Sequence, residues 1–399
     1  MTVFGYGTTT KAIVERFGNC KVYDDSFNGV AFDKNGNEFI QSDMFDPDKS
    51  ELEVTSPGIP PSNPLIQKAK NLISEYDLFA KEMPYSIWIT GTNGKTTTTA
   101  MIEYLLEKRG AVAGGNIGTP LAKLDQTAPI WILETSSFTL HYTKKAKPNL
   151  FILLPVSDDH TSWHGGFKEY EEAKLKPVKT LLEGEIAIVP KKYADMETNG
   201  TLIGYESAKD LAKEFDIDIE KINFSEPFLT DALLALAVTK ILFDEVDYEK
   251  INSFVVGEHR VEKLFDKEGR LWINDSKATN LDAVLAAVSG LKDKEIFLIL
   301  GGDDKGADLK PLFKNLPKNI TLFTIGTNEE KLLTLASVHE IKAVKCGDLK
   351  TAVKNISKVF TKQNQVALLS PAAASFDQFK SYADRGEKFK EMVKAIKEI

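Results

Sequence analysis

Short runs of β-branched and aromatic residues alternate along the chain with stretches whose apolar residues recur at helical spacing. The runs that we expect to be strands lie at 3–4, 20–23, 86–90, 131–133, 150–154, 186–189, 271–273 and 296–300. Helical patterns follow some of these runs, at 9–17 and 96–108. This alternation is typical of parallel sheets covered by helices, so we predict the α/β class.

Two segments divide this pattern. Residues 56–64 are rich in proline and glycine, and Met83-Pro84 precedes the next strand, so we place one boundary near residue 84. The second lies near Val256-Gly257, before the strand-rich segment 261–273. The 399 residues correspond to about 2.7 domains at roughly 150 residues each. We expect three domains, at 1–83, 84–256 and 257–399.

Composition and charge exclude several classes of protein. The chain has 50 basic and 58 acidic residues, a net charge of −8, which argues against binding to nucleic acid or to an anionic membrane. Its apolar runs are far shorter than the ~18 residues of a membrane-spanning helix. Its start lacks a signal-peptide pattern, and Cys20 and Cys346 have no metal-type spacing. We therefore expect a cytoplasmic protein with no membrane insertion.

A glycine-rich turn between the strand 86–90 and the helix 96–108 carries the strongest chemical signal. Its glycines allow backbone N–H groups to curl around phosphate oxygens, Lys95 can reach the terminal phosphates, and Thr96 can ligate Mg²⁺. Ile89 stands where the full eight-residue motif would have its first glycine. The alternative is an ordinary turn with a solvated lysine. The candidate ATP-binding residues are Gly91, Thr92, Asn93, Gly94, Lys95, Thr96 and Thr97.

A second glycine turn, Gly5-Tyr6-Gly7, follows the first strand and could hold a diphosphate at a helix N-terminus. Thr8 and Thr9 offer hydroxyl and N–H groups there, and Asp24 or Asp25 could hold a sugar hydroxyl. Residues 1–83 contain 8 basic and 13 acidic residues, a net charge of −5, so N–H groups must bind any phosphate. A βα turn without a ligand is equally compatible with this pattern.

Metal-ligating candidates follow two further strands. Glu134 ends the strand 131–133, where it could bind Mg²⁺ beside the phosphate loop or serve as an N-cap or salt-bridge acid. Asp158-Asp159-His160 follows the strand at 150–154, and we take His160 as a Mg²⁺ ligand. His164 is four residues later, but Trp163 and Gly165-Gly166 argue against a helix, so we expect a loop residue. Lys174, alone in a helical run, would ordinarily be solvated.

Two more segments place charged residues at strand ends. Residues 274–280, which contain Asp275 and Thr279, follow the strand 271–273, and residues 300–306, which contain Lys305, follow the strand 296–300. Strand ends of this kind form ligand crevices in α/β proteins. Each segment taken alone could equally be a structural turn.

Taken together, these residues resemble the Mur ligases, ATP-dependent enzymes that form amide bonds in peptidoglycan precursors. The residues that carry the resemblance are Thr90–Thr97, Gly115–Gly118, Glu134–Phe138, Asp159-His160, His259-Arg260, Trp272–Asn280, Leu369–Phe379 and Asp384-Arg385-Gly386. The last three are most similar to the members that add D-glutamate to UDP-N-acetylmuramoyl-L-alanine. The Asp-Asn-Pro-Arg motif of the diaminopimelate-adding members is absent from the sequence.

The resemblance implies a Rossmann-like UDP-binding domain, a central P-loop ATPase domain and a Rossmann-like amino-acid-binding domain. It implies two Mg²⁺ ions, an acyl-phosphate intermediate, and a CO₂-derived carbamate on Lys174 that holds the second ion beside His160. Asp231, Arg260 and Asp275 would contact ATP, while Ser56 and Asn116 would contact the muramoyl substrate. The implied D-glutamate ligands are Thr279, Lys305, Ser375 and Tyr382. We expect small-molecule substrates and a monomer.

Three alternatives remain open from the sequence. One is a ligase of the same fold that acts on a folate or on another precursor peptide. A nicotinamide oxidoreductase would use Gly5-Tyr6-Gly7, but it leaves the Lys95 loop unexplained. A nucleotide sensor without catalytic activity would bind ATP without turnover, and the presence of Glu134, His160 and Lys174 argues against it.

Overall fold

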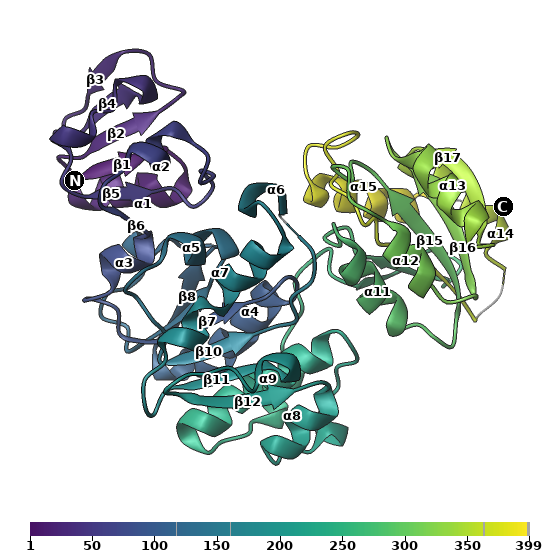
Figure 1. Cartoon of the computed structure of the whole chain (residues 1–399). Coiled ribbons are helices and arrows are strands. Elements are labelled where there is room, and N and C mark those ends of the chain that lie inside the picture. Colours follow the sequence, from purple (N-terminus) through teal and green to yellow (C-terminus); the bar gives the residue numbers. More distant parts are fainter. Residues whose placement is uncertain (117, 160, 362–363, 397–399) are drawn as a thin grey trace. The chain divides into compact units, whose positions relative to one another are not determined.

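The computed structural model describes residues 1–116, 118–159, 161–361 and 364–396 (Figure 1). Within these residues the strands form three six-stranded sheets, each with helices beside it. The chain divides into two compact units. The first contains residues 1–223 and 228–254, with two of the sheets, and the second contains residues 224–227 and 255–399, with the third.

The first sheet has the order β3-β4-β2-β1-β5-β6 and is parallel except for β3, which pairs antiparallel with β4. Its strands are β1 (Thr2–Phe4), β2 (Lys21–Asp24), β3 (Val30–Phe32), β4 (Glu38–Gln41), β5 (Glu53–Thr55) and β6 (Leu72–Ile73). The helices of this region are α1 (Thr8–Phe17), η1 (Ser42–Met44), η2 (Pro47–Lys49), α2 (Pro64–Lys68) and α3 (Glu75–Phe79). Because β1 lies centrally, its carboxyl end carries the Gly5–Gly7 turn into the middle of the sheet edge.

The second sheet is entirely parallel and has the order β12-β11-β10-β7-β9-β8. Its strands are β7 (Tyr85–Thr90), β8 (Ala111–Gly115), β9 (Ile130–Glu134), β10 (Leu150–Leu153), β11 (Ile186–Pro190) and β12 (Thr201–Tyr205). The α-helices are α4 (Lys95–Leu106), α5 (Ser137–Tyr142), α6 (Thr161–His164), α7 (Phe167–Thr180), α8 (Ala208–Glu214), α9 (Phe228–Phe243) and α10 (Tyr248–Asn252). The short 3₁₀ helices are η3 (Glu107–Arg109), η4 (Leu121–Lys123), η5 (Lys191–Tyr193) and η6 (Ile219–Lys221).

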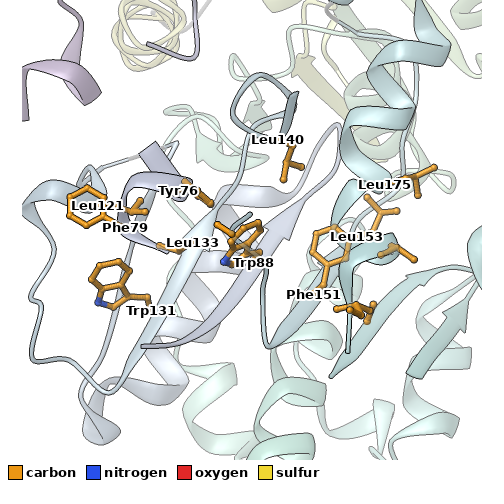
Figure 2. Close-up of a cluster of buried hydrophobic side chains, with 14 of the residues drawn as sticks. Tyr76, Phe79, Trp88, Leu121, Trp131, Leu133, Leu140, Phe151, Leu153 and Leu175 are labelled. Carbon is orange, nitrogen blue, oxygen red and sulfur yellow. The ribbon is translucent and has the colours of Figure 1, made fainter. Parts of the chain in front are cut away.

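The strands of this second sheet are hydrophobic on both faces because helices cover both. Figure 2 shows one of the resulting clusters, in which Trp88 of β7 and Phe151 of β10 lie near Leu140 of α5 and Leu175 of α7. α9 is apolar on nearly its whole circumference, which is typical of a fully buried helix. It packs against α4, the helix that begins at Lys95. The packing therefore fixes the helix on which the phosphate loop depends.

The third sheet has the order β13-β14-β18-β15-β16-β17, in which only the β13–β14 pair is antiparallel. Its strands are β13 (Glu262–Phe265), β14 (Leu271–Asn274), β15 (Glu295–Gly301), β16 (Ile320–Ile325), β17 (Lys342–Gly347) and β18 (Gln365–Leu369). Its helices are α11 (Leu281–Ser289), α12 (Lys310–Asn315), α13 (Glu329–Val338), α14 (Leu349–Val359) and α15 (Tyr382–Lys394). One core cluster gathers around Leu298 and Leu322, and another around Trp272 and Phe297.

The predicted α/β class is confirmed. The strands of the three sheets lie within residues 2–73, 85–205 and 262–369, and the second compact unit resumes at Val255. The boundaries near 84 and 257 stay predictions. Across the part of the chain that the structure describes, every helix is too short or too polar to cross a membrane.

Candidate active site

The phosphate loop lies between the end of β7 at Thr90 and the start of α4 at Lys95. Its two glycines have positive φ angles, 152° at Gly91 and 85° at Gly94. A Cβ atom on Gly91 would lie 2.4 Å from the Cβ of Leu154, and one on Gly94 would lie 2.8 Å from an oxygen of Asp231. Glycine is therefore required at both positions, for its backbone conformation and for the close approach of the neighbouring residues.

Thr92 anchors the loop to neighbouring strand ends. Its N–H donates to the carbonyl of Pro155 at 3.0 Å, and its hydroxyl donates to the carbonyl of Ser157 at 3.0 Å. The same hydroxyl lies 3.0 Å from the hydroxyl of Tyr170 on α7. The loop is thus held by the segment after β10 and by α7, so its N–H groups have fixed directions.

Lys95 begins α4 and lies across the loop. Its Nζ donates to the carbonyl oxygens of Gly91 at 2.9 Å and of Thr92 at 2.8 Å. The side chain is half-buried, which contradicts the alternative of a solvated lysine in an ordinary turn. Thr96 follows in the first turn of α4, where its hydroxyl is available to a cation bound at the loop.

Lys174 of α7 is buried beneath the same loop, 1% exposed, and is not the solvated helix residue that its sequence position would ordinarily indicate. Its Nζ donates to the Gly91 carbonyl at 2.8 Å and to the Thr90 hydroxyl at 3.2 Å. Burial, together with the charge of Lys95, lowers the pKa of Lys174 well below its ordinary value, against the opposing effects of two carboxylates. A lowered pKa increases the neutral, nucleophilic fraction of a lysine amine.

Glu134 ends β9, and its carboxylate is 2% exposed. Oε1 accepts from the side-chain amide of Asn116 at 2.8 Å, whereas the buried Oε2 has no hydrogen-bond partner among the described residues. A buried carboxylate oxygen without a partner is costly, and a divalent cation would satisfy it. The N-cap alternative is wrong, because Ser136 caps α5 by accepting from the N–H of Thr139 at 3.0 Å.

Of the two histidines that the sequence offered as candidates, His160 lies outside the described residues. His164 was expected in a loop, and that prediction is wrong, because it ends the short helix α6 and is 7% exposed. Its Nε2 lies 3.0 Å from the hydroxyl of Ser137, and its ring stacks on Phe138. Gly165-Gly166 ends this helix after one turn rather than preventing it.

Asp231, which the resemblance assigns to ATP, lies on α9 and is 4% exposed. One of its oxygens accepts from the hydroxyl of Thr98 on α4 at 2.8 Å. The same carboxylate approaches Gly94, so it borders the phosphate loop. A role in adenine recognition stays a prediction.

The first sheet carries a separate pocket of about 180 Å³ at the carboxyl ends of its strands. The residues that line it are Gly5, Tyr6, Gly7, Tyr23, Asp24, Asp25, Ser56, Gly58, Ile59, Asn63 and Leu65. Gly7 precedes α1 and supplies no side-chain cap, so the N–H groups of Thr8 and Thr9 face this end of the helix. Lysine and arginine are absent from this lining, as expected from the acidic charge of the region.

Asp24 shapes the pocket by holding its turn. One oxygen accepts from the N–H of Tyr6 at 2.7 Å, and the other accepts from the N–H of Ser26 at 2.8 Å. Burial opposes ionisation, but a hydrogen bond from the Ser26 hydroxyl, together with these two backbone hydrogen bonds and the charge of Lys11, outweighs it and lowers the pKa of Asp24. Asp25 and Ser56 also line the pocket, whereas Asn116 is bonded to Glu134 instead. Contact of Asn116 with the muramoyl substrate stays a prediction.

In the second compact unit, Asp275 follows β14 and is 6% exposed. Its oxygens accept from the N–H of Val261 at 3.2 Å and from the hydroxyl of Ser370 at 2.8 Å. Burial raises the pKa of Asp275 to about 7, and these hydrogen bonds and Arg260 oppose the rise. His259 and Val261 have φ angles of 61° and 49°, so Arg260 stands between two strained residues.

The four predicted D-glutamate ligands follow strands of the third sheet or begin its last helix: Thr279 follows β14, Lys305 follows β15, Ser375 follows β18 and Tyr382 begins α15. Lys305 and Thr279 are exposed, Ser375 is buried, and Tyr382 is 36% exposed. Paired backbone hydrogen bonds between Asp303 and Ala374, of 3.0 and 2.9 Å, join the loop of Lys305 to that of Ser375. The Nζ of Lys277 lies 3.9 Å from the centre of the Tyr382 ring.

Arg385 is a functional candidate that our sequence reasoning did not assign to the site. It is 1% exposed, and its guanidinium donates to the Ser276 carbonyl at 2.9 Å and to the Ala373 carbonyl at 3.1 Å. Burial lowers its pKa to about 10. The sequence signal for this residue was the segment Asp384-Arg385-Gly386. A buried arginine needs fixed hydrogen-bond acceptors. Arg385 finds them in the loops that contain Ser276 and Ala373, and it holds these two loops together.

A phosphate loop with a buried lysine beneath it, and a separate pocket at the carboxyl edge of the first sheet, indicate a nucleotide-dependent enzyme with its own site for a second ligand. The sequence pattern of the Mur ligase middle domain matches residues 89–262, and that of the Mur ligase glutamate ligase domain matches residues 259–373. The chain belongs to the Mur ligase family. This membership favours the ligase hypothesis over the oxidoreductase hypothesis.

Two relatives that match nearly the whole chain carry the same name. The chain is 54% identical over 401 residues to the UDP-N-acetylmuramoylalanine–D-glutamate ligase of Campylobacter jejuni, covering 99% of this chain and 100% of the relative. It is 41% identical over 418 residues to the enzyme of the same name from Helicobacter pylori, covering 98% of this chain and 99% of that relative.

Solved structures share the fold at low identity. The MurF ligase of Thermotoga maritima in complex with ADP has a TM-score of 0.57 at 18% identity and covers 86% of this chain and 88% of that one. The MurC ligase of Thermotoga maritima has a TM-score of 0.57 at 16% identity and covers 98% of both chains.

Proposed function

We propose that this protein is an ATP-dependent ligase that joins D-glutamate to UDP-N-acetylmuramoyl-L-alanine in peptidoglycan precursor synthesis. The observation that carries the proposal is the phosphate loop with Lys174 and Glu134 buried against it. The full-length similarity to D-glutamate ligases supports the choice of substrates. We propose that the enzyme acts as a cytoplasmic monomer.

The reaction has two steps, phosphorylation of the carboxylate and displacement of the phosphate by an amine. A carboxylate oxygen of the alanyl group attacks the γ-phosphorus of ATP, and the bond to the bridging oxygen breaks to release ADP. The amine of D-glutamate then attacks the acyl carbon, loses a proton, and the tetrahedral intermediate expels phosphate. Both steps bring anions together, so the site must stabilise negative charge that develops during transfer.

The chain's own groups supply this stabilisation. The N–H groups of the loop from Gly91 to Gly94 surround the phosphates, and Lys95 exchanges its carbonyl partners for phosphate oxygens. Two Mg²⁺ ions, when bound, neutralise charge on the transferring phosphoryl group. Thr96 and Glu134 would hold the first ion, and the unpartnered Oε2 of Glu134 fits that role. His160 would contribute to the second.

We further propose that Lys174 carries a carbamate. Its neutral amine attacks CO₂, a C–N bond forms and a proton is released, which converts a buried amine into an anionic oxygen ligand for the second Mg²⁺. The lowered pKa of Lys174 makes the neutral amine available. The negative charge of the carbamate next to the Lys95 ammonium favours the product, whereas the charged form of Lys174 would be repelled by it.

The deciding experiment measures ATP-dependent phosphate release with UDP-N-acetylmuramoyl-L-alanine as acceptor. We expect release with D-glutamate and none above background with L-glutamate. A folate acceptor with L-glutamate tests the ligase of the same fold. Phosphate release with the folate acceptor, or release with L-glutamate but not with D-glutamate, would overturn the substrate assignment. ATP binding without release under any condition would instead favour a nucleotide sensor.

A further inference from the structure

The pocket of the first sheet is held from outside by two aromatic side chains of the region around the second sheet. The hydroxyl of Tyr142, at the end of α5, donates to the Ile59 carbonyl at 2.6 Å. The indole Nε1 of Trp163, on α6, donates to the Gly58 carbonyl at 3.2 Å. Gly58 and Ile59 both line the pocket, so these two bonds fix part of its wall.

Trp163 is itself held in a cluster of aromatic rings. Its ring centre lies 4.6 Å from that of Phe138, 5.3 Å from that of His141 and 5.8 Å from that of Tyr142. The indole is only half-buried, so it is not simply part of a hydrophobic core. Its polar edge is directed at the pocket loop while its faces pack on α5.

The other end of this cluster reaches the phosphate loop. His164 follows Trp163 and lies 5.4 Å, ring centre to ring centre, from Tyr170 of α7. The hydroxyl of Tyr170 contacts Thr92 at 3.0 Å, and its ring lies 4.8 Å from the Nζ of Lys174. Packed side chains therefore connect the wall of the pocket to the phosphate loop and to the proposed carbamate lysine.

We infer that Trp163 is a positioning residue that couples occupancy of the first-sheet pocket to the phosphate loop. The inference rests on the proposed function, in which this pocket takes the UDP portion of the substrate. A substrate that fixes the Gly58-Ile59 wall also fixes Trp163, and with it α6 and the packing on Tyr170. Coupling between two sites is reciprocal, so bound nucleotide must strengthen substrate binding by the same factor.

The test compares Trp163→Phe, which keeps a smaller aromatic ring and loses the N–H donor, with Tyr142→Phe, which loses the other donor. Calorimetry gives the Kd of UDP-N-acetylmuramoyl-L-alanine with and without a non-hydrolysable ATP analogue. We expect Trp163→Phe to weaken binding of the UDP substrate about 3- to 10-fold, as for one lost hydrogen bond. The factor by which the analogue strengthens that binding should fall toward one, while the Kd of the analogue alone stays constant.

Tyr248→Phe is the matched control, because it removes a tyrosine hydroxyl that accepts from the N–H of Asp218 elsewhere in the same unit. It should leave both the Kd and the coupling factor unchanged. If Trp163→Phe and Tyr142→Phe lower only the melting temperature and keep the wild-type coupling factor, Trp163 is merely a packing residue and the inference is wrong. A wild-type protein that fails to bind the UDP substrate would instead overturn the proposed function, and this inference with it.

Discussion

Lys174 combines deep burial with two oxygen acceptors, and no carboxylate is hydrogen-bonded to its Nζ among the described residues. A permanently charged lysine would be costly here, which is why its pKa is lowered. The same environment suits an amine that reacts with CO₂. The charge of this one group therefore decides whether the site can hold a second cation.

We predict that Lys174→Ala loses activity by on the order of 100-fold or more, as for removal of a group that stabilises transferring charge. Short-chain carboxylates should partly restore turnover, because they replace the anionic oxygens of the carbamate. Removal of bicarbonate from the wild-type enzyme should lower the rate reversibly. Lys168→Ala is the control, since Lys168 lies on the same helix with its side chain 81% exposed. Full activity of Lys174→Ala would exclude the carbamate.

For Lys95 we expect Lys95→Ala to reduce kcat about 10²- to 10³-fold, as for loss of one preorganised charge at the transferring phosphoryl group. Its partners are two carbonyl oxygens of the loop and its side chain is only half-buried, so thermal unfolding should shift little. Single-turnover phosphate release and a melting curve measure the two effects. Near-native turnover, or a large loss of stability, would contradict this role for Lys95.

The sequence predicts some of these residues better than others. Gly91, Gly94 and Lys95 can be found because their roles depend on local backbone geometry within one turn. Lys174 is different, since helical periodicity predicts a solvated lysine and only tertiary packing beneath Gly91 buries it. Arg385 likewise acquires its role from loops that are distant in sequence.

At the scale of elements, the buried strands β7, β9, β10 and β15 and the helices α1 and α4 follow from sequence because their patterns extend over several residues. The buried strand β18 and the 16-residue helix α9 were not among our predictions. The exposed edge strand β3 has only three residues, too few to show an alternating pattern, and we predicted no strand there. α6 escapes prediction because a single turn is too short to show a period. Near the site, the sequence therefore predicts the elements with extended patterns better than the short segments beside them.

The short helix α3 carries a buried carboxyl group whose effect on stability can be tested. Glu75 is 5% exposed and accepts a long hydrogen bond of 3.4 Å from the N–H of Ala122 in η4. Burial raises its pKa to about 8, against weak opposition from the backbone groups of Ala122 and Leu121. The folded protein therefore keeps this carboxyl protonated at neutral pH, while the unfolded chain ionises it.

Because the folded pKa is raised, the stabilising contribution is complete below the ordinary pKa of 4.5 and is lost as pH rises to about 8. Glu75→Gln removes this titration. We expect the free energy of unfolding of the wild type to fall relative to the variant by up to about 1 kcal/mol per pH unit in that window. Urea unfolding of both proteins at pH 5, 6.5 and 8 measures the difference. A constant difference would show that Glu75 ionises equally in both states.

At the scale of the whole molecule, the net charge does not attract the proposed ligands. The chain carries −8, and ATP, the UDP substrate and glutamate are all anions. Binding must therefore depend on placed groups at short range, such as the loop N–H groups, the start of α1, Lys95 and the bound cations. Contacts of this kind are screened by salt far less than a long-range field.

This argument predicts a weak dependence of substrate binding on ionic strength. A basic binding surface would lose much of its affinity when NaCl rises from about 0.05 to about 0.3 M, because the Debye length falls below 10 Å. Here the KM for the UDP substrate should change less than about threefold over that range, since screening also relieves the repulsion from the −8 charge. The measurement is steady-state phosphate release at constant free Mg²⁺, with KCl as a second salt. A steep rise in KM with both salts would mean that a positive field guides the substrate, which neither the acidic first 83 residues nor the lining of their pocket provides.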